Sequence, residues 1–132
     1  MSDRTAALLT KVVAVVIALR ALTNVGKPFG AGRGLVFFGN LQTGTPNLIL
    51  APTLGILMLV LAYGMWGNAS WALPASIVYA VFVTLNVPLF IVFEGIPAQF
   101  SVWQYALFGL VAIGGAWLAP WSLSQQRLAV HR

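Results

Sequence analysis

Three long stretches without a charged residue are the feature of this sequence that excludes the most folds. They cover residues 47–66, 71–93 and 101–119. A bilayer core is about 30 Å thick and is crossed by roughly 20 residues of α-helix, so each stretch is long enough to span it. Only 7% of the 132 residues are charged and 60% are hydrophobic, whereas soluble domains have about 25% charged residues. We therefore expect an all-α integral membrane protein.

A fourth and weaker apolar stretch lies near the N-terminus, at about residues 6–25. It contains Lys11 and Arg20, so its fully apolar centre covers only residues 12–19. A basic end before a short apolar run is also typical of a secretory signal peptide, which stays open as an alternative. We favour a retained span because no Ala-x-Ala cleavage site follows Arg20. Long basic side chains near helix ends can also reach the lipid headgroups.

The expected architecture is one transmembrane domain, residues 1–132, built as a small antiparallel bundle of four helices. Their approximate limits are residues 6–25, 46–66, 71–93 and 101–119. Only residues 67–70 separate the second helix from the third, which predicts a tight antiparallel hairpin.

Local signals support the limits of these helices. Pro46 suits a first helical position, where its missing N–H costs nothing. Ser101 and Gln104 have the spacing of a capping box. Pro120 is expected to end the last helix, which leaves residues 121–132 as a short polar tail.

Four spans place the connections at residues 26–46 and 94–100 on one side of the membrane and both termini on the other. Lys and Arg near the spans number three on the first side and four on the second. This small excess favours cytoplasmic termini. The net charge of +5 comes from residues at segment ends and in one connection, where basic side chains meet headgroups. We therefore expect membrane lipids and not nucleic acid as partners.

Glu94 is the only carboxylate side chain beyond residue 3. An ionisable group at membrane depth is a functional candidate, and its partner should be named. Arg20, Lys27 and Arg33 lie on the same side of the membrane and are the candidates for an ion pair. One interpretation makes Glu94 a proton or cation acceptor whose pKa a basic neighbour adjusts. The other makes it a structural ion pair or a solvated acid at a helix end.

The connection at residues 26–46 is rich in glycine and carries two basic residues. Glycine-rich backbone can form nests that bind anions, so a lipid headgroup or an anionic solute is a candidate ligand. The alternative is a flexible loop facing the headgroups. Residues 35–38 are apolar but too short to span a bilayer. We therefore expect this connection to be interfacial or re-entrant.

Tyr79 and Asn86 are the polar residues expected deep in the third helix. They are seven residues apart and so share one helix face. An amide in an apolar environment needs a hydrogen-bond partner. Such groups line transport pathways in some membrane proteins and simply connect helices in others.

The fourth helix has a stripe of small residues at spacings of three and four, which lets helix backbones approach closely. Its members are Ala106, Gly109, Ala112, Ala116 and Ala119. The partner of this stripe is another helix of the chain or of a second copy.

The sequence offers no candidate catalytic group and no metal site. It has no Cys, and its only His, His131, is next to last. General acid–base and nucleophilic mechanisms need paired groups, and metal sites need clustered ligands. We therefore expect neither enzymatic activity nor a cofactor.

The favoured function is a structural, accessory or assembly role through helix–helix and lipid contacts. The expected protein partners are other membrane-protein subunits or further copies of the chain. The alternative is a small oligomeric transporter or channel with Glu94 and Asn86 lining the pathway. The compact, loop-poor chain favours a multi-pass protein of a bacterial inner membrane.

Overall fold

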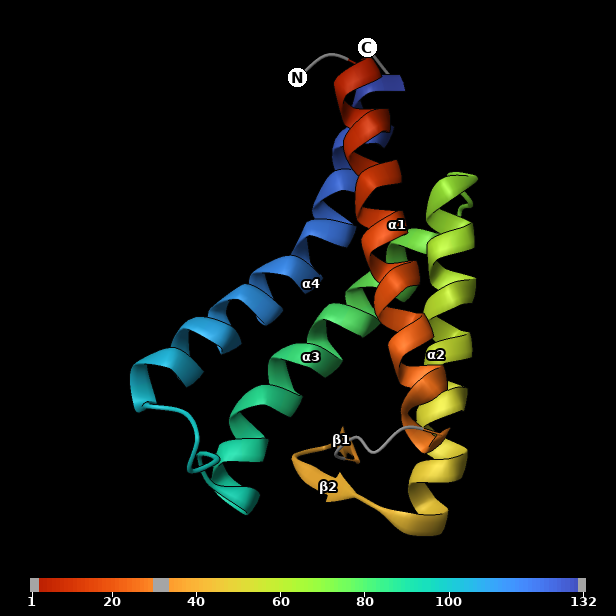
Figure 1. Cartoon of the computed structure of the whole chain (residues 1–132). Helices are drawn as coiled ribbons and strands as arrows, with labels where there is room; N and C mark the ends of the chain where they lie inside the picture. Colours follow the sequence, from red (N-terminus) through yellow and green to blue (C-terminus); the bar gives the residue numbers. More distant parts are fainter. Residues whose placement is uncertain (1–2, 30–33, 131–132) are drawn as a thin grey trace.

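The structure, a computed structural model shown in Figure 1, describes residues 3–29 and 34–130. Four long helices make up most of this part of the chain, and a two-stranded hairpin lies between the first and the second. The elements in order are α1 (Asp3–Gly26), η1 (a 3-10 turn, Lys27–Phe29), β1 (Leu35–Phe37), β2 (Asn40–Gln42), α2 (Gly44–Trp66), α3 (Ala72–Glu94) and α4 (Val102–Val130).

Each of the four helices is long and apolar enough to cross a membrane. The prediction of four long, apolar helices is therefore confirmed, and the chain has the features of a multi-pass membrane protein. The predicted capping box at the start of α4 is also confirmed. Ser101 N–H donates to Gln104 Oε1 at 2.9 Å, and Gln104 N–H donates to Ser101 Oγ at 3.2 Å.

The helices pack as two pairs, α1 with α2 and α3 with α4. Both termini and the α2–α3 turn lie at one end of the molecule, where α1 and α4 meet (Figure 1). We call this the closed end. The two pairs diverge toward the opposite end, which we call the open end and which carries the β-hairpin.

The predicted tight hairpin of α2 and α3 is wrong, because these helices separate directly after their short connection. The turn itself is closely packed. The Trp71 ring lies so close to Gly64 that a β-carbon at Gly64 would overlap it. The two helices are therefore in contact at the turn and diverge beyond it.

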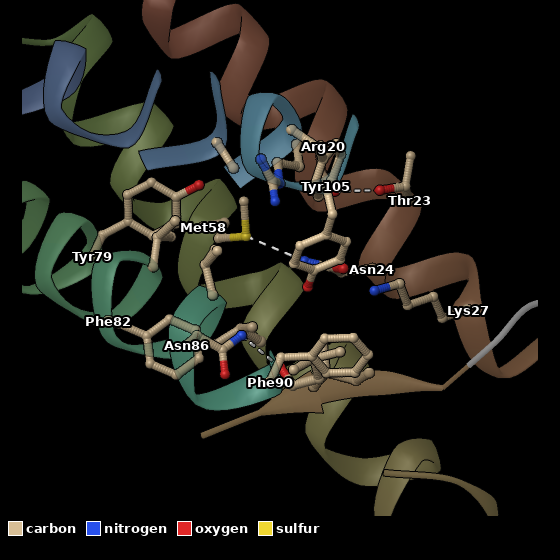
Figure 2. A pocket seen from close by; sticks show the side chains of 17 residues that line it. Arg20, Thr23, Asn24, Lys27, Met58, Tyr79, Phe82, Asn86, Phe90 and Tyr105 are labelled. Atoms are coloured by element: carbon tan, nitrogen blue, oxygen red, sulfur yellow. Dashed lines mark hydrogen bonds between the residues drawn. The ribbon is translucent and has the colours of Figure 1, made fainter. Parts of the chain in front are cut away.

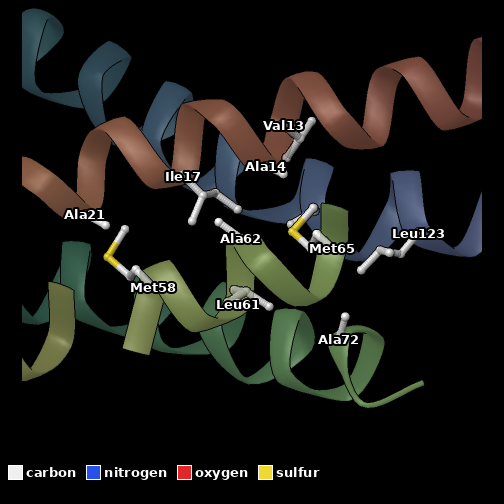
Figure 3. Packing of buried hydrophobic residues seen from close by; sticks show 11 residues of the cluster. Val13, Ala14, Ile17, Ala21, Met58, Leu61, Ala62, Met65, Ala72 and Leu123 are labelled. Carbon is white, nitrogen blue, oxygen red and sulfur yellow. The ribbon is translucent and has the colours of Figure 1, made fainter. Parts of the chain in front are cut away.

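The main core lies toward the closed end and joins all four helices (Figure 3). Val13 and Ile17 of α1 face Met58 and Met65 of α2, and Leu123 of α4 completes the cluster. Because α1 supplies buried residues to this core, the four-helix fold depends on the N-terminal segment.

Helix α4 continues through Pro120 to Val130, so the prediction that it ends before Pro120 is wrong. Proline removes one helical hydrogen bond, but the following turns gain tertiary contacts. Leu123 is fully buried in the main core. Arg127 Nη2 donates to the carbonyl oxygens of Ala69 at 3.0 Å and Ser70 at 2.9 Å. Residues 121–130, which were expected to form a polar tail, are therefore helical.

The small-residue stripe of α4 contacts the same chain. Gly109, Ala112, Ala116 and Ala119 are buried, whereas Ala106 is exposed. Ala112 and Ala116 pack against Ala80 and Val83 of α3. Trp117 reinforces this pair, because its indole N–H donates to Thr84 Oγ1 at 3.0 Å.

Close contact of α1 and α2 at Gly55 gives a prediction for stability. A β-carbon there would lie 2.6 Å from Val25 Cγ2 and 2.8 Å from the carbonyl oxygen of Ala21. Overpacking of this kind costs about 1–3 kcal/mol. We expect Gly55→Ala to lower the midpoint of thermal unfolding in a neutral detergent. Gly114→Ala is the matched control, since its β-carbon would meet nothing within 4 Å, and an equal loss in both variants would contradict the close contact.

Candidate functional site

The β-hairpin at the open end was not predicted as a hairpin. Its two-residue turn is Phe38–Gly39, with φ of 46° and 82°, as primed hairpin turns require. The favoured sequences for such turns are Asn-Gly and Asp-Gly, so Phe-Gly is a weak signal. The two strands are antiparallel, and their paired residues are Leu35–Gln42, Val36–Leu41 and Phe37–Asn40.

Asn86 of α3 attaches this hairpin to the helices. Its Oδ1 accepts from Gly39 N–H at 2.9 Å, and its Nδ2 donates to the Val36 carbonyl at 3.1 Å. The turn also contacts α3 directly, because a β-carbon at Gly39 would lie 2.5 Å from the Leu89 carbonyl carbon. The amide that the sequence placed deep in a span therefore satisfies backbone groups of the hairpin.

Glu94 binds the second strand of the hairpin. Its Oε1 accepts from Leu41 N–H at 3.0 Å. Within the described residues it forms no ion pair with Arg20 or Lys27, and Arg33 lies outside those residues. The only carboxylate of the spans thus bonds to backbone because the hairpin, and not α1, lies beside the end of α3.

A third polar side chain supports the start of the hairpin from α2. Asn47 is buried, and its Oδ1 accepts from Leu35 N–H at 2.9 Å. The hairpin is therefore bonded to α2 of one helix pair and to α3 of the other. Backbone polar groups outside helices need partners of their own, and these three side chains supply them for the hairpin.

A cavity of about 380 Å³ lies above the hairpin, between the two helix pairs (Figure 2). All four helices and β1 contribute to its wall. Tyr79 and Asn86, which share one face of α3 as predicted, both line it. Tyr105 of α4 closes the opposite wall, where its ring stacks on Phe90 with a centroid distance of 6.1 Å. The cavity is therefore walled by aromatic rings.

The charge of this cavity comes from Arg20 and Lys27. They are seven residues apart on α1 and η1, so about two helical turns place them on the same side. Figure 2 shows both side chains beside the cavity together with the Tyr105 ring. No carboxylate contributes to the wall that the structure describes. The cavity thus presents two cations without a protein counter-charge.

The remaining polar groups in the wall are mostly bonded within the protein. Thr23 Oγ1 donates to the Arg20 carbonyl at 2.7 Å, and Asn24 Nδ2 donates to Met58 Sδ at 3.3 Å. Within the described residues, neither the Tyr79 nor the Tyr105 hydroxyl makes a hydrogen bond. Within the described part of the chain, two cations and two phenol hydroxyls are consequently available to bind a ligand.

Two apolar spaces adjoin this cavity. A groove of about 450 Å³ lies between α2 and α3, where the helices diverge, and its wall includes Met58 and Tyr79 of the cavity. A smaller space of about 230 Å³ lies between α1 and α4 and includes Arg20. The basic cavity is therefore flanked by apolar openings on both sides.

Sequence reasoning did not identify Tyr105 or Asn47 as part of the site. Each is a polar residue within or beside an apolar stretch, which was the available signal. The face on which each side chain lies depends on helix packing, which the sequence pattern did not resolve. Among the described residues, no three His, Cys, Asp or Glu side chains come together as metal ligands.

Comparisons with known proteins found no relative of this chain. No protein-family model, no curated protein and no solved structure matches it. The site must therefore be interpreted from its own geometry and chemistry.

The attachment of the hairpin by Asn86 can be tested by substitution. Asn86→Ala removes both hydrogen bonds and leaves Gly39 N–H and the Val36 carbonyl without these partners. Leaving a buried polar group unsatisfied costs about 1–3 kcal/mol of stability. We expect amide hydrogen exchange across residues 35–42 to accelerate about tenfold or more. Asn40→Ala is the matched control, because within the described residues the only hydrogen bond of its side chain is a 3.4 Å contact to the Phe38 carbonyl. Unchanged exchange in Asn86→Ala would contradict this attachment.

Proposed function

We propose that this chain is a small membrane accessory protein that binds an anionic molecule in the cavity between its two helix pairs. The observation that carries the proposal is the pair Arg20 and Lys27, which face one cavity without a carboxylate in its described wall. Its expected location stays the inner membrane of a bacterium.

Unpaired cations are costly where water is excluded; here Lys27 is half-buried and Arg20 is exposed on the surface that a bilayer would cover. A cation in a low-dielectric site is expensive unless a counter-charge or water compensates it. Arg presents a planar set of donors that suits phosphate and carboxylate groups, and Lys adds a compact charge. Basic pockets between transmembrane helices bind anionic headgroups in other membrane proteins. An anion is therefore the guest that this cavity suits best.

The assembly part of the proposal rests on the open end. Beyond the α3 contacts, the first turns of α4 carry large exposed apolar side chains, among them Trp103 and Leu107. A bilayer or a second membrane protein can cover such a surface. We propose that α4 contacts other subunits or further copies there, which fits an accessory role.

A small oligomeric transporter or channel has less support. In that alternative, Glu94 and Asn86 line the pathway. Their side chains already bond to the backbone of the hairpin, so using them for transport would require breaking these contacts. The accessory role needs no such rearrangement.

Anion binding predicts ligand-dependent stabilisation that requires both cations. In a neutral maltoside detergent, we expect dioleoyl phosphatidylglycerol or glycerol phosphate to raise the midpoint of thermal unfolding more than dioleoyl phosphatidylcholine does. Each charge-assisted contact contributes about 1.5–3 kcal/mol, or roughly ten- to hundredfold in affinity. The double variant Arg20→Gln/Lys27→Gln should lose this response.

Lys11→Gln is the control for a change of charge on the same helix. Lys11 Nζ lies 5.2 Å from the centre of the Trp66 ring and does not line the cavity. Its variant should keep the anion response. The proposal fails if neither anion stabilises the wild-type protein, or if the double variant responds as strongly as the wild type.

A further inference from the structure

We infer that the anion is the headgroup of a membrane lipid whose acyl chain lies in the apolar groove between α2 and α3. This inference rests on the proposed function and extends it from a charge to a class of ligand. It follows from the shape of the groove and from the side chains that it shares with the basic cavity.

The groove has almost entirely apolar walls. Leu57 and Leu61 of α2 face Val78 of α3 across it. The divergence of the two helices leaves this space open at about 450 Å³. A hydrocarbon chain can fill such a space by dispersion contacts, without hydrogen-bonding groups of its own.

Both ends of the groove carry aromatic side chains. Trp71 lies at the closed end, beside the α2–α3 turn. Phe37 and Phe38 of the hairpin lie at the open end and cluster with Phe82, with ring centroids 5.8 Å and 5.4 Å from it. A space limited at both ends suits a flexible chain better than a straight transmembrane helix, which would need an uninterrupted path.

The groove and the basic cavity are adjacent. Leu54, Met58, Tyr79 and Phe82 form part of the wall of both. In our proposal one lipid passes between these shared side chains, with its headgroup at Arg20 and Lys27 and its acyl chain in the groove. A lipid with a charged headgroup and an apolar acyl chain can occupy both spaces, whereas a water-soluble anion would leave the groove unoccupied.

Photocrosslinking in detergent micelles tests whether the acyl chain of the lipid lies in the groove. The probe is phosphatidylglycerol with a diazirine near the end of one acyl chain, and phosphatidylcholine with the same chain is the reference. Mapping by mass spectrometry should show severalfold more labelling of the facing sides of α2 and α3 by the anionic probe. Arg20→Gln/Lys27→Gln should reduce this labelling to the level of the phosphatidylcholine probe, because the charge-assisted contacts are lost.

A matched pair of variants separates the groove from the rest of the α3 surface. Val78 and Val92 are 69% and 74% exposed on α3, but only Val78 lines the groove. Val78→Trp should reduce groove labelling severalfold, and Val92→Trp should leave it unchanged. Val78→Trp should also keep the stabilisation by glycerol phosphate, which shows that its cavity is intact.

The inference is overturned if both probes label the groove equally or if Val78→Trp has no effect on labelling. The response to glycerol phosphate then distinguishes two failures. If glycerol phosphate stabilises the wild type and not the double variant, the cavity still binds an anion, and only the proposed position of the acyl chain is wrong. If neither glycerol phosphate nor phosphatidylglycerol stabilises the wild type, the proposed function fails as well.

Discussion

The need to satisfy backbone polar groups in an apolar environment determines how this molecule is built at its open end. Helices satisfy their own backbone, but a short hairpin between helices does not. Here Asn47, Asn86 and Glu94 supply the missing partners from α2 and α3. The hairpin is thereby fixed as the floor of the cavity between the two helix pairs. Loss of these bonds would leave that cavity without a defined lower wall.

The shape above this floor comes from unequal helix packing. Gly55 brings α1 and α2 into close contact, and the stripe around Ala112 and Ala116 does the same for α3 and α4. At the turn that joins α2 and α3 the Trp71 ring packs on Gly64, and the two helices diverge beyond it. Two tight helix pairs that diverge leave a space between them, and Arg20 of α1 and Lys27 of η1 give that space its charge.

Much of this fold could be predicted from sequence because its strongest signals are local. The charge-free stretches located three spans, and Ser101 with Gln104 marked the start of α4 correctly. The failures involve contacts between distant residues. Pro120 was expected to end α4, but the burial of Leu123 and the bonds of Arg127 to the α2–α3 turn keep the chain helical.

The candidate site shows the same division between local and distant information. Charge and polarity identified Arg20, Lys27, Tyr79, Asn86 and Glu94 as unusual residues in an apolar chain. The sequence could not reveal that Asn86 and Glu94 bond to a hairpin, since those contacts join residues about 50 positions apart. Nor could it show that Arg20 and Lys27 face a common cavity.

We propose that Arg20 and Lys27 hold an anionic membrane molecule between the helix pairs. Native mass spectrometry of the protein released from neutral detergent micelles measures this most directly. After incubation with equal amounts of phosphatidylglycerol and phosphatidylcholine, the wild type should retain one phosphatidylglycerol in preference, and the Arg20→Gln/Lys27→Gln variant should not. Equal retention of both lipids by the wild type, or an unchanged preference in the variant, would contradict the claim.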